Sequence, residues 1–266
     1  MRKGDSREGK HHNVRSDKGL RTSKGKVELE KEREVRTGSG GSGRRLRRER
    51  SGIQDSLINW KRQSLIFNPD TFQGSDVTIV GLGNIGSQTA LALARLGISN
   101  MFLYDHDTVE AHNLASQSFD TTHLGVPKVE ATASIMKKVN PTMVAGTVQN
   151  KFDGKSVLSD ILIIAVDSMK ERKRICANMK KAGTLPRLII DGRMGGPQIE
   201  VYSVQSFEEW EDTFVDNPSL DPCGARYICY SSMVIGSFIA NQVKRFLKEE
   251  KLKKEILFNI DTYQLL

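Results

Sequence analysis

Short apolar runs alternate along most of the chain with longer segments in which apolar residues recur at helical spacing. The first apolar run, 77–80 (VTIV), is rich in β-branched residues and is followed by an Ala- and Leu-rich segment that ends at Gly97. A second apolar run, 100–104, comes next. We therefore predict a strand, a helix over 84–96 and a second strand, since glycine readily adopts the left-handed conformation that ends a helix.

The same alternation continues toward the end of the chain. Pro127 opens the next helix, in a first turn where its missing N–H costs nothing. The remaining predicted strands are 143–149, 160–166, 187–190, 199–204 and 256–262, and the remaining predicted helices are 127–140, 155–159, 169–182 and 228–247. Such alternation indicates a doubly wound, Rossmann-like α/β fold, in which a mostly parallel sheet has helices on both faces.

Two segments depart from this alternation. Segment 57–72 mixes apolar anchors with basic residues, and we expect a short helix and a loop that pack onto the sheet before the first strand. Segment 206–226 contains acids and two prolines without periodicity. We expect a long connecting loop there, and long loops in compact domains are often functional.

Composition separates a tail from the folded part. Residues 1–50 contain 17 Lys and Arg against 8 Asp and Glu, with almost no large apolar residue. They cannot bury enough surface to offset the entropy of ordering. The net charge of +8 lies in this segment, because the rest of the chain is close to neutral. We predict a disordered basic tail over 1–50 and one α/β domain over 51–266.

The densest basic cluster is RRLRRER at 44–50. One interpretation is a nucleic-acid partner held through phosphate contacts, and the other is a solvated tail that keeps the protein soluble. No aromatic residue is interleaved with the charges, which favours the solvated tail.

Cysteine content and hydropathy indicate a cytoplasmic protein without a membrane span. Cys176, Cys223 and Cys229 are too few for a disulfide framework and form no CxxC pair, so we expect a reducing compartment and no zinc. Cys176 and Cys229 fall in predicted helices and are expected in the core. The longest uncharged stretch, 227–243, is shorter than the roughly 20 apolar residues of a membrane span, so we interpret it as a buried helix.

The turn after the first strand is typical of a nucleotide-binding site. Gly81, Gly83 and Gly86 permit a tight turn, close approach of a phosphate, and close packing of helix on strand. The N–H groups at the start of the helix attract the phosphate. Asp105 follows Gly86 by 19 residues, a spacing that also suits a nicotinamide dinucleotide. The pattern predicts a bound nucleotide without identifying it.

Two further carboxylates are predicted at the same edge of the sheet. Asp167 follows the predicted strand 160–166, and Asp191 follows 187–190. Ligands of such sheets bind at the carboxyl ends of the strands, so both are candidates for the site. Asp167 has an alternative role as the N-cap of the next helix.

The motifs that follow Asp105 resemble those of one family. The chain reads DHDTVEAHNLASQSF from Asp105, then LGVPK up to Lys128, and IIAVDS around Asp167. With the glycine turn, this series resembles the ThiF/MoeB/HesA family, whose adenylating domain also occurs in ubiquitin-activating enzymes. The resemblance extends from Trp60 to the end of the chain.

The resemblance implies a role for most of these residues. Asp105 would accept hydrogen bonds from the ribose hydroxyls of ATP, while the amides of Asn113 and Gln117 and the charge of Lys128 would surround the triphosphate. Asp167 would hold Mg²⁺, which prefers carboxylate oxygen. The implied nucleotide-binding set is Gly81, Gly83, Asn84, Gly86, Asp105, Asp107, Asn113, Gln117 and Lys128. The implied reaction is attack of a substrate carboxylate on the α-phosphate, which gives an acyl-adenylate and pyrophosphate.

Some of these side chains have simpler interpretations. A lysine in the first turn of a helix, such as Lys128, is usually solvated, and Asn113 would also satisfy a loop backbone. Two more catalytic residues are implied by position in the family pattern. Arg62 would reach into a partner subunit's site and stabilise pyrophosphate. Cys223 would accept the acyl group, with Arg226 favouring its thiolate, unless it is a loop cysteine without chemistry.

One position departs from the family pattern. Ser116 stands where many members carry an arginine directly before Gln117. The missing guanidinium removes a charge-assisted contact to phosphate. Either another cation compensates, or the enzyme is slow, or the domain binds a nucleotide without turnover.

We therefore predict an ATP- and Mg²⁺-dependent adenylyltransferase of ThiF type that works without zinc, as a homodimer. Its substrate would be the C-terminal glycine of a ubiquitin-like or sulfur-carrier protein, with transfer to a cysteine if Cys223 is reactive. The alternatives are a tRNA-modifying dehydratase of the same family, which the basic tail would suit, a nicotinamide-dependent oxidoreductase, and a non-catalytic nucleotide-binding scaffold.

Overall fold

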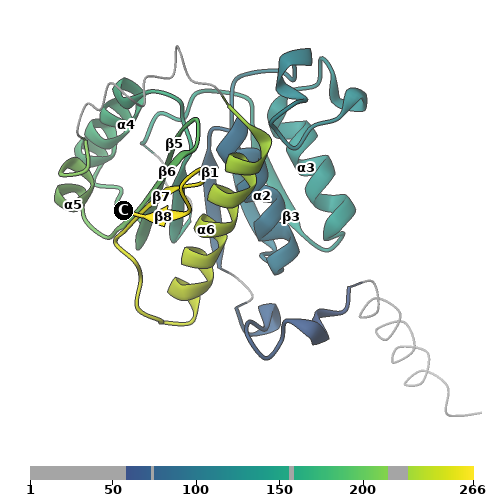
Figure 1. The fold of residues 1–266 in the computed structure, drawn as a ribbon, viewed down its shortest axis with the longest axis horizontal. Helices are drawn as coiled ribbons and strands as arrows, with labels where there is room; N and C mark the ends of the chain where they lie inside the picture. Colours follow the sequence, from purple (N-terminus) through teal and green to yellow (C-terminus); the bar gives the residue numbers. More distant parts are fainter. Residues whose placement is uncertain (1–57, 73–74, 156–158, 215–226) are drawn as a thin grey trace, which may run out of the picture. The chain divides into compact units, whose positions relative to one another are not determined.

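The computed structural model describes residues 58–72, 75–155, 159–214 and 227–266 (Figure 1). The predicted basic tail over 1–50, the cluster at 44–50 and Cys223 lie outside these ranges. The predicted helix at 155–159 also falls largely outside them, on 156–158.

A single sheet organises the described residues. Its eight strands run in the order β3-β2-β1-β4-β5-β6-β7-β8. The pairs from β3 to β5 are parallel, and those from β5 to β8 are antiparallel. The strands are β1 (Asp76–Val80), β2 (Asn100–Tyr104), β3 (Val144–Val148), β4 (Ile161–Ile164), β5 (Leu188–Gly195), β6 (Gln198–Val204), β7 (Glu255–Asn259) and β8 (Gln264–Leu265). The predicted α/β class with a mostly parallel sheet is confirmed.

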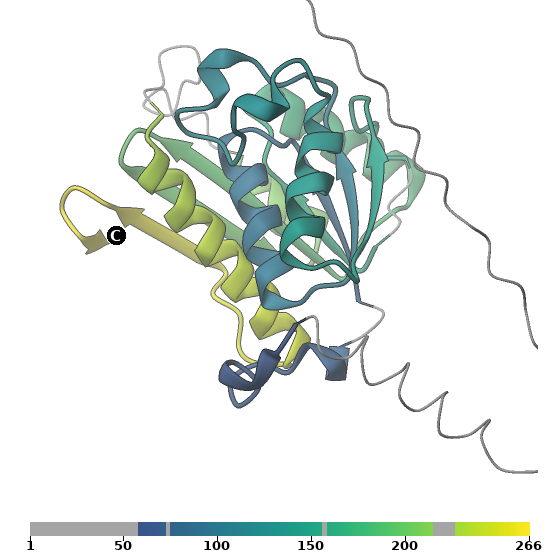
Figure 2. The same cartoon turned by 90° about the vertical axis from the view of Figure 1, so that its right-hand side faces the viewer.

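Helices cover both faces of the sheet, as the doubly wound fold requires. Helices α2 (Asn84–Leu96), α3 (Lys128–Val139) and α6 (Cys229–Leu247) lie side by side on one face (Figure 2). Helices α4 (Met169–Ala182) and α5 (Phe207–Glu211) lie on the other face (Figure 1). Among the described residues, no helix has both the length and the apolar character needed to cross a membrane.

The strand β4 shows why the central strands read as unbroken apolar runs. All four of its residues are buried. Ile161 and Ile163 belong to the core beneath α2 and α6, whereas Leu162 and Ile164 belong to the core beneath α4. A strand covered on both faces needs apolar side chains at every position, because successive residues point to opposite faces.

The helix ends follow the glycines that the sequence marks. Gly97 ends α2 with φ 99° and Gly183 ends α4 with φ 68°. Both angles lie in the left-handed region, where glycine has no Cβ to clash. The predicted ends of these two helices are confirmed.

The strand β5 is longer than predicted, so Asp191 lies inside the strand and not after it. The pairing explains the difference. Ile164, the last residue of β4, pairs with Asp191, and β5 continues to Gly195 because β6 pairs with it up to Gln198. The apolar run ends before the strand does, since an antiparallel neighbour supplies the remaining hydrogen bonds.

The chain after β6 differs from prediction in two further ways. Segment 206–226 is not wholly a loop, because α5 forms where Ser206 accepts a hydrogen bond from the N–H of Glu209 and Trp210 is buried. Residues 215–226 lie outside the described ranges. The predicted strand 256–262 is β7, which is followed by the unpredicted two-residue strand β8. Cys176 is buried as expected, but Cys229 is exposed at the start of α6, so its assignment to the core is wrong.

The segment before β1 contains the short 3-10 helices η1 (Trp60–Arg62) and η2 (Pro69–Phe72). It packs at the carboxyl-terminal end of α2, where the side-chain amide of Gln63 donates to the carbonyl of Leu96 over 2.8 Å (Figure 2). Phe67 is buried and stacks on Phe72, with ring centroids 5.0 Å apart. The predicted short helix and loop are therefore present as 3-10 turns.

Candidate nucleotide-binding site

One large cavity opens at the carboxyl ends of β1, β2 and β4. Its volume is about 800 Å³, within the range of small-molecule and cofactor pockets. Of the residues predicted to bind nucleotide or metal, it is lined by Gly81, Gly83, Asn84, Asp105, Asp107, Asn113, Gln117, Lys128 and Asp167. The fold thus brings together residues from five separate segments of the sequence.

Two predicted residues do not line the cavity. Gly86 lies beneath it, inside α2, where it serves packing. Arg62 is exposed in η1, at the opposite end of α2 from the cavity. Thirteen helical residues separate the two ends by about 20 Å, so Arg62 cannot reach the cavity of its own chain.

The glycine turn and the start of α2 form one wall of the cavity. Gly81 has φ 89°, which glycine alone tolerates readily, and an added Cβ would meet the carbonyl oxygen of Ala165 at 2.7 Å. A Cβ on Gly83 would meet only the side-chain nitrogen of Gln117, at 3.9 Å. Gly83 is also the N-cap of α2 and offers no side-chain cap. The first N–H groups of α2 therefore face a site open enough for an anion.

Asp105 lies at the end of β2 and is largely buried. One carboxylate oxygen accepts the N–H of Leu82 over 2.6 Å, and the other accepts the N–H of Asp107 over 2.8 Å. These bonds hold the carboxylate against the glycine turn. Each oxygen keeps a further lone pair, so Asp105 can still accept a hydroxyl from a ligand.

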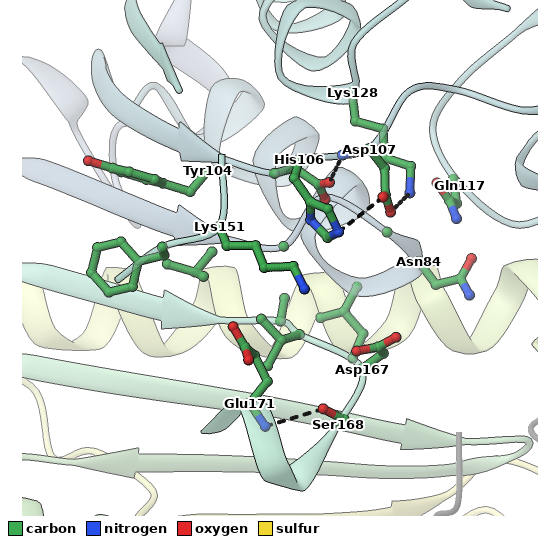
Figure 3. Close-up of a pocket in the computed structure, with 18 of the residues that line it drawn as sticks. Asn84, Tyr104, His106, Asp107, Gln117, Lys128, Lys151, Asp167, Ser168 and Glu171 are labelled. Carbon is green, nitrogen blue, oxygen red and sulfur yellow. Dashed lines mark hydrogen bonds and ion pairs between the residues drawn. The ribbon is translucent and has the colours of Figure 1, made fainter. Parts of the chain in front are cut away.

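Lys128 is buried at the start of α3, with its side chain 9% exposed, although lysines in a first helical turn are usually solvated. Its ammonium lies 3.0 Å from the carboxylate of Asp107, which is half exposed (Figure 3). Partial desolvation raises the pKa of Asp107, but the hydrogen bond and charge of Lys128 outweigh it, so the pKa is lowered. Lys128 thus places a buried positive charge at the wall of the cavity, paired with one half-exposed carboxylate.

The side-chain amides of Asn113 and Gln117 differ in their hydrogen bonding. Asn113 is buried, and its side-chain oxygen accepts the N–H of Glu110 over 2.9 Å, as the simpler interpretation expects. This bond leaves its NH₂ group for a ligand. The side-chain oxygen of Gln117 is buried without a hydrogen-bond partner in the described residues. An unpartnered buried polar group beside a cavity fits a site that is completed by a ligand.

Asp167 follows β4 and is exposed to the cavity. The N-cap of α4 is Ser168, whose hydroxyl accepts the N–H of Glu171 over 3.2 Å (Figure 3). The alternative role of Asp167 as the helix cap is therefore wrong. Its carboxylate has no hydrogen bond or ion pair within the described ranges and is free to bind a hard cation such as Mg²⁺.

Asp191 supports the cavity wall from below. It is fully buried and accepts hydrogen bonds from Arg172, Arg193 and the indole N–H of Trp210. Burial alone would raise the pKa of Asp191, but the two guanidinium groups lower it. Arg172 and Arg193 also line the cavity, although the sequence pattern does not single out either residue. Their buried positions are set by the extension of β5 and by the packing of α4.

Lys151 and Glu171 also line the cavity and were not predicted. Lys151 comes three residues after β3, so the rule that ligands bind at the carboxyl ends of strands could have identified it. Glu171 lies in the first turn of α4 and is held by Arg174. Asp105, His106 and Asp107 could also place three ligand atoms within 4.8 Å of one another. The two aspartates there already accept hydrogen bonds from backbone N–H groups and Lys128, which disfavours a metal at that point.

Comparison with known proteins shows which sequences this chain resembles. The sequence profile of the ThiF family matches residues 68–265. Ubiquitin-like modifier-activating enzyme 5 of Branchiostoma floridae is 35% identical over 122 residues, which cover 43% of this chain and 30% of that protein. The Gallus gallus protein of the same name is 33% identical over 120 residues, with the same coverage. These matches span less than a third of each curated relative.

Solved structures share the fold at lower identity. PaaA superposes with a TM-score of 0.61 at 20% identity, over 86% of this chain and 75% of that one. Escherichia coli MccB, solved with ATP, has a TM-score of 0.61 at 18% identity, over 74% and 64%. The E. coli tRNA N6-threonylcarbamoyladenosine dehydratase TcdA, also solved with ATP, has a TM-score of 0.55 at 19% identity, over 68% and 88%. The profile match covers well over half of the sequence, and this chain belongs to the ThiF family.

Proposed function

We propose that this chain binds ATP and Mg²⁺ and adenylates the C-terminal glycine carboxylate of a small ubiquitin-like or sulfur-carrier protein. The observation that carries the proposal is the convergence on one cavity of an uncapped helix N-terminus at Gly83, a strand-end carboxylate at Asp105 and a buried cation at Lys128. The helix N-terminus suits the phosphates of a nucleotide, the carboxylate suits its ribose hydroxyls, and the cation suits the negative charge of its triphosphate.

In this proposal the chain's residues bind and orient the reactants. Asp105 accepts the ribose hydroxyls, and the N–H groups at the start of α2 hold the phosphates. Lys128, Asn113 and Gln117 surround the triphosphate. Asp167 holds Mg²⁺, which when bound would draw charge from the departing pyrophosphate.

The proposed reaction needs no covalent group from the protein. An oxygen of the substrate carboxylate attacks the α-phosphorus, and the bond from the α-phosphorus to the bridging oxygen breaks. The products are an acyl-adenylate and pyrophosphate. The chain contributes by aligning the carboxylate with the phosphate and by stabilising the charge that moves onto pyrophosphate.

The proposed substrate rests on the comparisons with known proteins. The curated relatives are named as enzymes that activate ubiquitin-like modifiers, and MccB has been solved with MccA. Both observations support a small protein as the substrate. A nicotinamide-dependent oxidoreductase is less well supported, because hydride transfer has no use for Lys128 or for the free carboxylate of Asp167.

We also propose a cytoplasmic homodimer with composite sites. The support is the position of Arg62, which is exposed and about 20 Å from the cavity of its own chain. Such a residue could reach a site only in a second copy. Transfer of the acyl group to Cys223 is also part of the proposal. Cys223 itself lies outside the described residues.

ATP–pyrophosphate exchange with Mg²⁺ tests the proposed function directly. We expect exchange that depends on a carrier protein with a free Gly-Gly carboxyl end, and we expect it to disappear in Asp167→Ala. Exposed Asp261, far along the chain in the turn after β7, gives the matched control Asp261→Ala. Binding of NAD(H) in preference to ATP would contradict the assignment.

The second candidate is a nucleotide-binding scaffold without turnover. It is favoured by one observation, the uncharged Ser116 at the family's arginine position, where its hydroxyl bonds to Asn84. The scaffold predicts ATP binding by calorimetry with no exchange for any carrier. Exchange that requires tRNA in place of a carrier would instead favour the dehydratase.

A further inference from the structure

We infer that Lys151 is a nucleotide-binding residue of this cavity, and that its ammonium contacts the phosphates. The inference rests on the proposed function, since it supposes that the cavity holds ATP. Lys151 lies on the loop between β3 and β4 and extends into the space between Asp107 and Asp167 (Figure 3).

The backbone that directly follows Lys151 is held against α4 and the residues just after that helix. A guanidinium N–H of Arg174 donates to the carbonyl of Phe152 over 2.6 Å, and the amide of Asn178 donates to the carbonyl of Asp153 over 2.8 Å. The hydroxyl of Thr184 donates to the carbonyl of Gly154 over 2.9 Å. These bonds fix the point from which the Lys151 side chain starts, so little backbone entropy is lost when it binds a ligand.

Phe152 anchors the same loop in the core. It is buried in the wall of the cavity, and its ring meets that of Tyr104 edge to face, with ring centroids 5.0 Å apart. Its neighbour Lys151 is exposed, and its backbone N–H donates to the side chain of Asn150 over 2.8 Å. The loop therefore buries the Phe152 side chain and leaves that of the preceding residue, Lys151, exposed at the cavity.

Lys151 differs from the other lysines and arginines of the cavity in its ion pairing. Lys128 is paired with Asp107, and Arg172 and Arg193 are both paired with Asp191. Within the ranges that the structure describes, the ammonium of Lys151 has no carboxylate within ion-pair distance. Among the described lysines and arginines that line this cavity, Lys151 is therefore the one whose charge is not already shared with a carboxylate.

The electrostatic effect of Lys151 reaches both sides of the cavity. Partial desolvation raises the pKa of Asp107, but Lys128 and, more weakly, His106 and Lys151 lower it. On the opposite side, the hydrogen bond from Arg174 lowers the pKa of Glu171 against partial desolvation, and Lys151 adds to the lowering. A triphosphate between these sides would lie in the positive potential of Lys151.

The cavity wall at Asn84, to which Ser116 is bonded, has no such charge. Ser116 donates its hydroxyl to Asn84 and leaves this wall neutral, whereas ATP carries several negative charges. Lys151 approaches from the loop on the other side of the glycine turn. It supplies from the β3 side a cation that the Ser116 side lacks.

The test compares Lys151→Ala with Lys151→Arg by calorimetric titration with ATP, AMP and adenosine. A charge-assisted contact in a partly closed pocket predicts about a tenfold weaker affinity for ATP in Lys151→Ala. We expect a smaller loss for AMP, no change for adenosine, and near-normal ATP binding by Lys151→Arg. Lys137→Ala, an exposed lysine of α3 that does not line this cavity, is the matched control.

The outcomes separate this inference from the proposed function. Equal losses for ATP and adenosine would mean that Lys151 packs on the base or ribose, which would overturn the phosphate contact. Unchanged ATP binding in Lys151→Ala would overturn the inference while the proposed function stands. Wild-type protein that does not bind ATP would overturn both. Thermal unfolding of each variant, followed by circular dichroism, identifies a loss of ATP binding that is caused by misfolding. If Lys151→Ala misfolds, Lys151→Arg tests the phosphate contact, which predicts near-normal ATP binding by that variant.

Discussion

The hydroxyl of Ser116 donates a hydrogen bond to the side-chain oxygen of Asn84 over 2.6 Å. This bond joins the loop before Gln117 to the first residue of α2, beside the open position at Gly83. The family pattern leads us to expect a guanidinium at position 116, but the neutral hydroxyl found there bonds to Asn84, which lines the cavity. The cavity depends for positive charge on Lys128, on Lys151 and on the N-terminus of α2.

Restoring a cation at this wall should strengthen nucleotide binding. We expect Ser116→Arg to bind ATP about fivefold to tenfold more tightly than wild type, because a guanidinium can form charge-assisted hydrogen bonds to phosphate. Calorimetric titration with ATP and adenosine measures the effect, and only ATP should respond. Ser134→Arg, on the exposed face of α3, controls for added net charge. An unchanged ATP affinity would mean that the phosphates do not lie near Ser116.

Two glycines of the turn should respond differently to alanine. A Cβ on Gly86 would overlap the carbonyl oxygen of Gly81, which is backbone and cannot move aside, so Gly86→Ala should unfold at a markedly lower temperature. A Cβ on Gly83 meets only the Gln117 amide, at 3.9 Å, so Gly83→Ala should keep its stability and bind ATP more weakly. Thermal unfolding and calorimetry on the two variants check this contrast. Equal loss of stability in both would contradict it.

The buried cluster of Asp191, Arg172 and Arg193 should make stability sensitive to acid. Asp191 has a pKa below its ordinary value in the folded protein, so its stabilising contribution is present above the unfolded-state pKa of about 4. That contribution is lost as the pH falls through the lower, folded-state pKa.

Asp191→Asn should remove this dependence and lower the free energy of unfolding by about 3 kcal/mol near pH 7. The variant leaves two buried guanidinium groups without a counter-charge. Urea unfolding at several pH values between 3 and 7 measures both effects. Asp261→Asn, at an exposed turn, should change neither. A pH profile of Asp191→Asn parallel to that of wild type would show that other carboxylates dominate.

The two described cysteines should differ in reactivity. Burial and, after it, the charge of Glu211 raise the pKa of Cys176 to about 11. At pH 8 only about one molecule in a thousand then carries the thiolate, which is the reactive form. Cys229 is exposed at the start of α6. Alkylation with iodoacetamide, followed by peptide mass spectrometry, should label Cys229 well before Cys176, and comparable rates would contradict the buried position of Cys176.

Local pattern alone was enough to predict the first half of the site. The apolar run of β1, the glycines of the turn and the apolar spacing of α2 are adjacent in sequence, and each is dictated by backbone geometry. Asp105 could be predicted for the same reason, since it ends the next strand. The central strands could also be predicted from the sequence, because a strand buried on both faces needs an unbroken apolar run.

Tertiary structure decided what depends on partners distant in sequence. The length of β5 and the burial of Asp191 follow from pairing with β6 and from two arginines that the pattern did not single out. Lys128 is buried where its ammonium and its backbone N–H both donate to Asp107, 21 residues earlier in the chain, and Cys229 is exposed although its helix is largely apolar. The sequence by itself determined the nucleotide-type turn and the parallel core through local geometry. The charges that surround the cavity, Lys151 among them, were assigned by packing, because a side chain's partner depends on which elements the fold brings together.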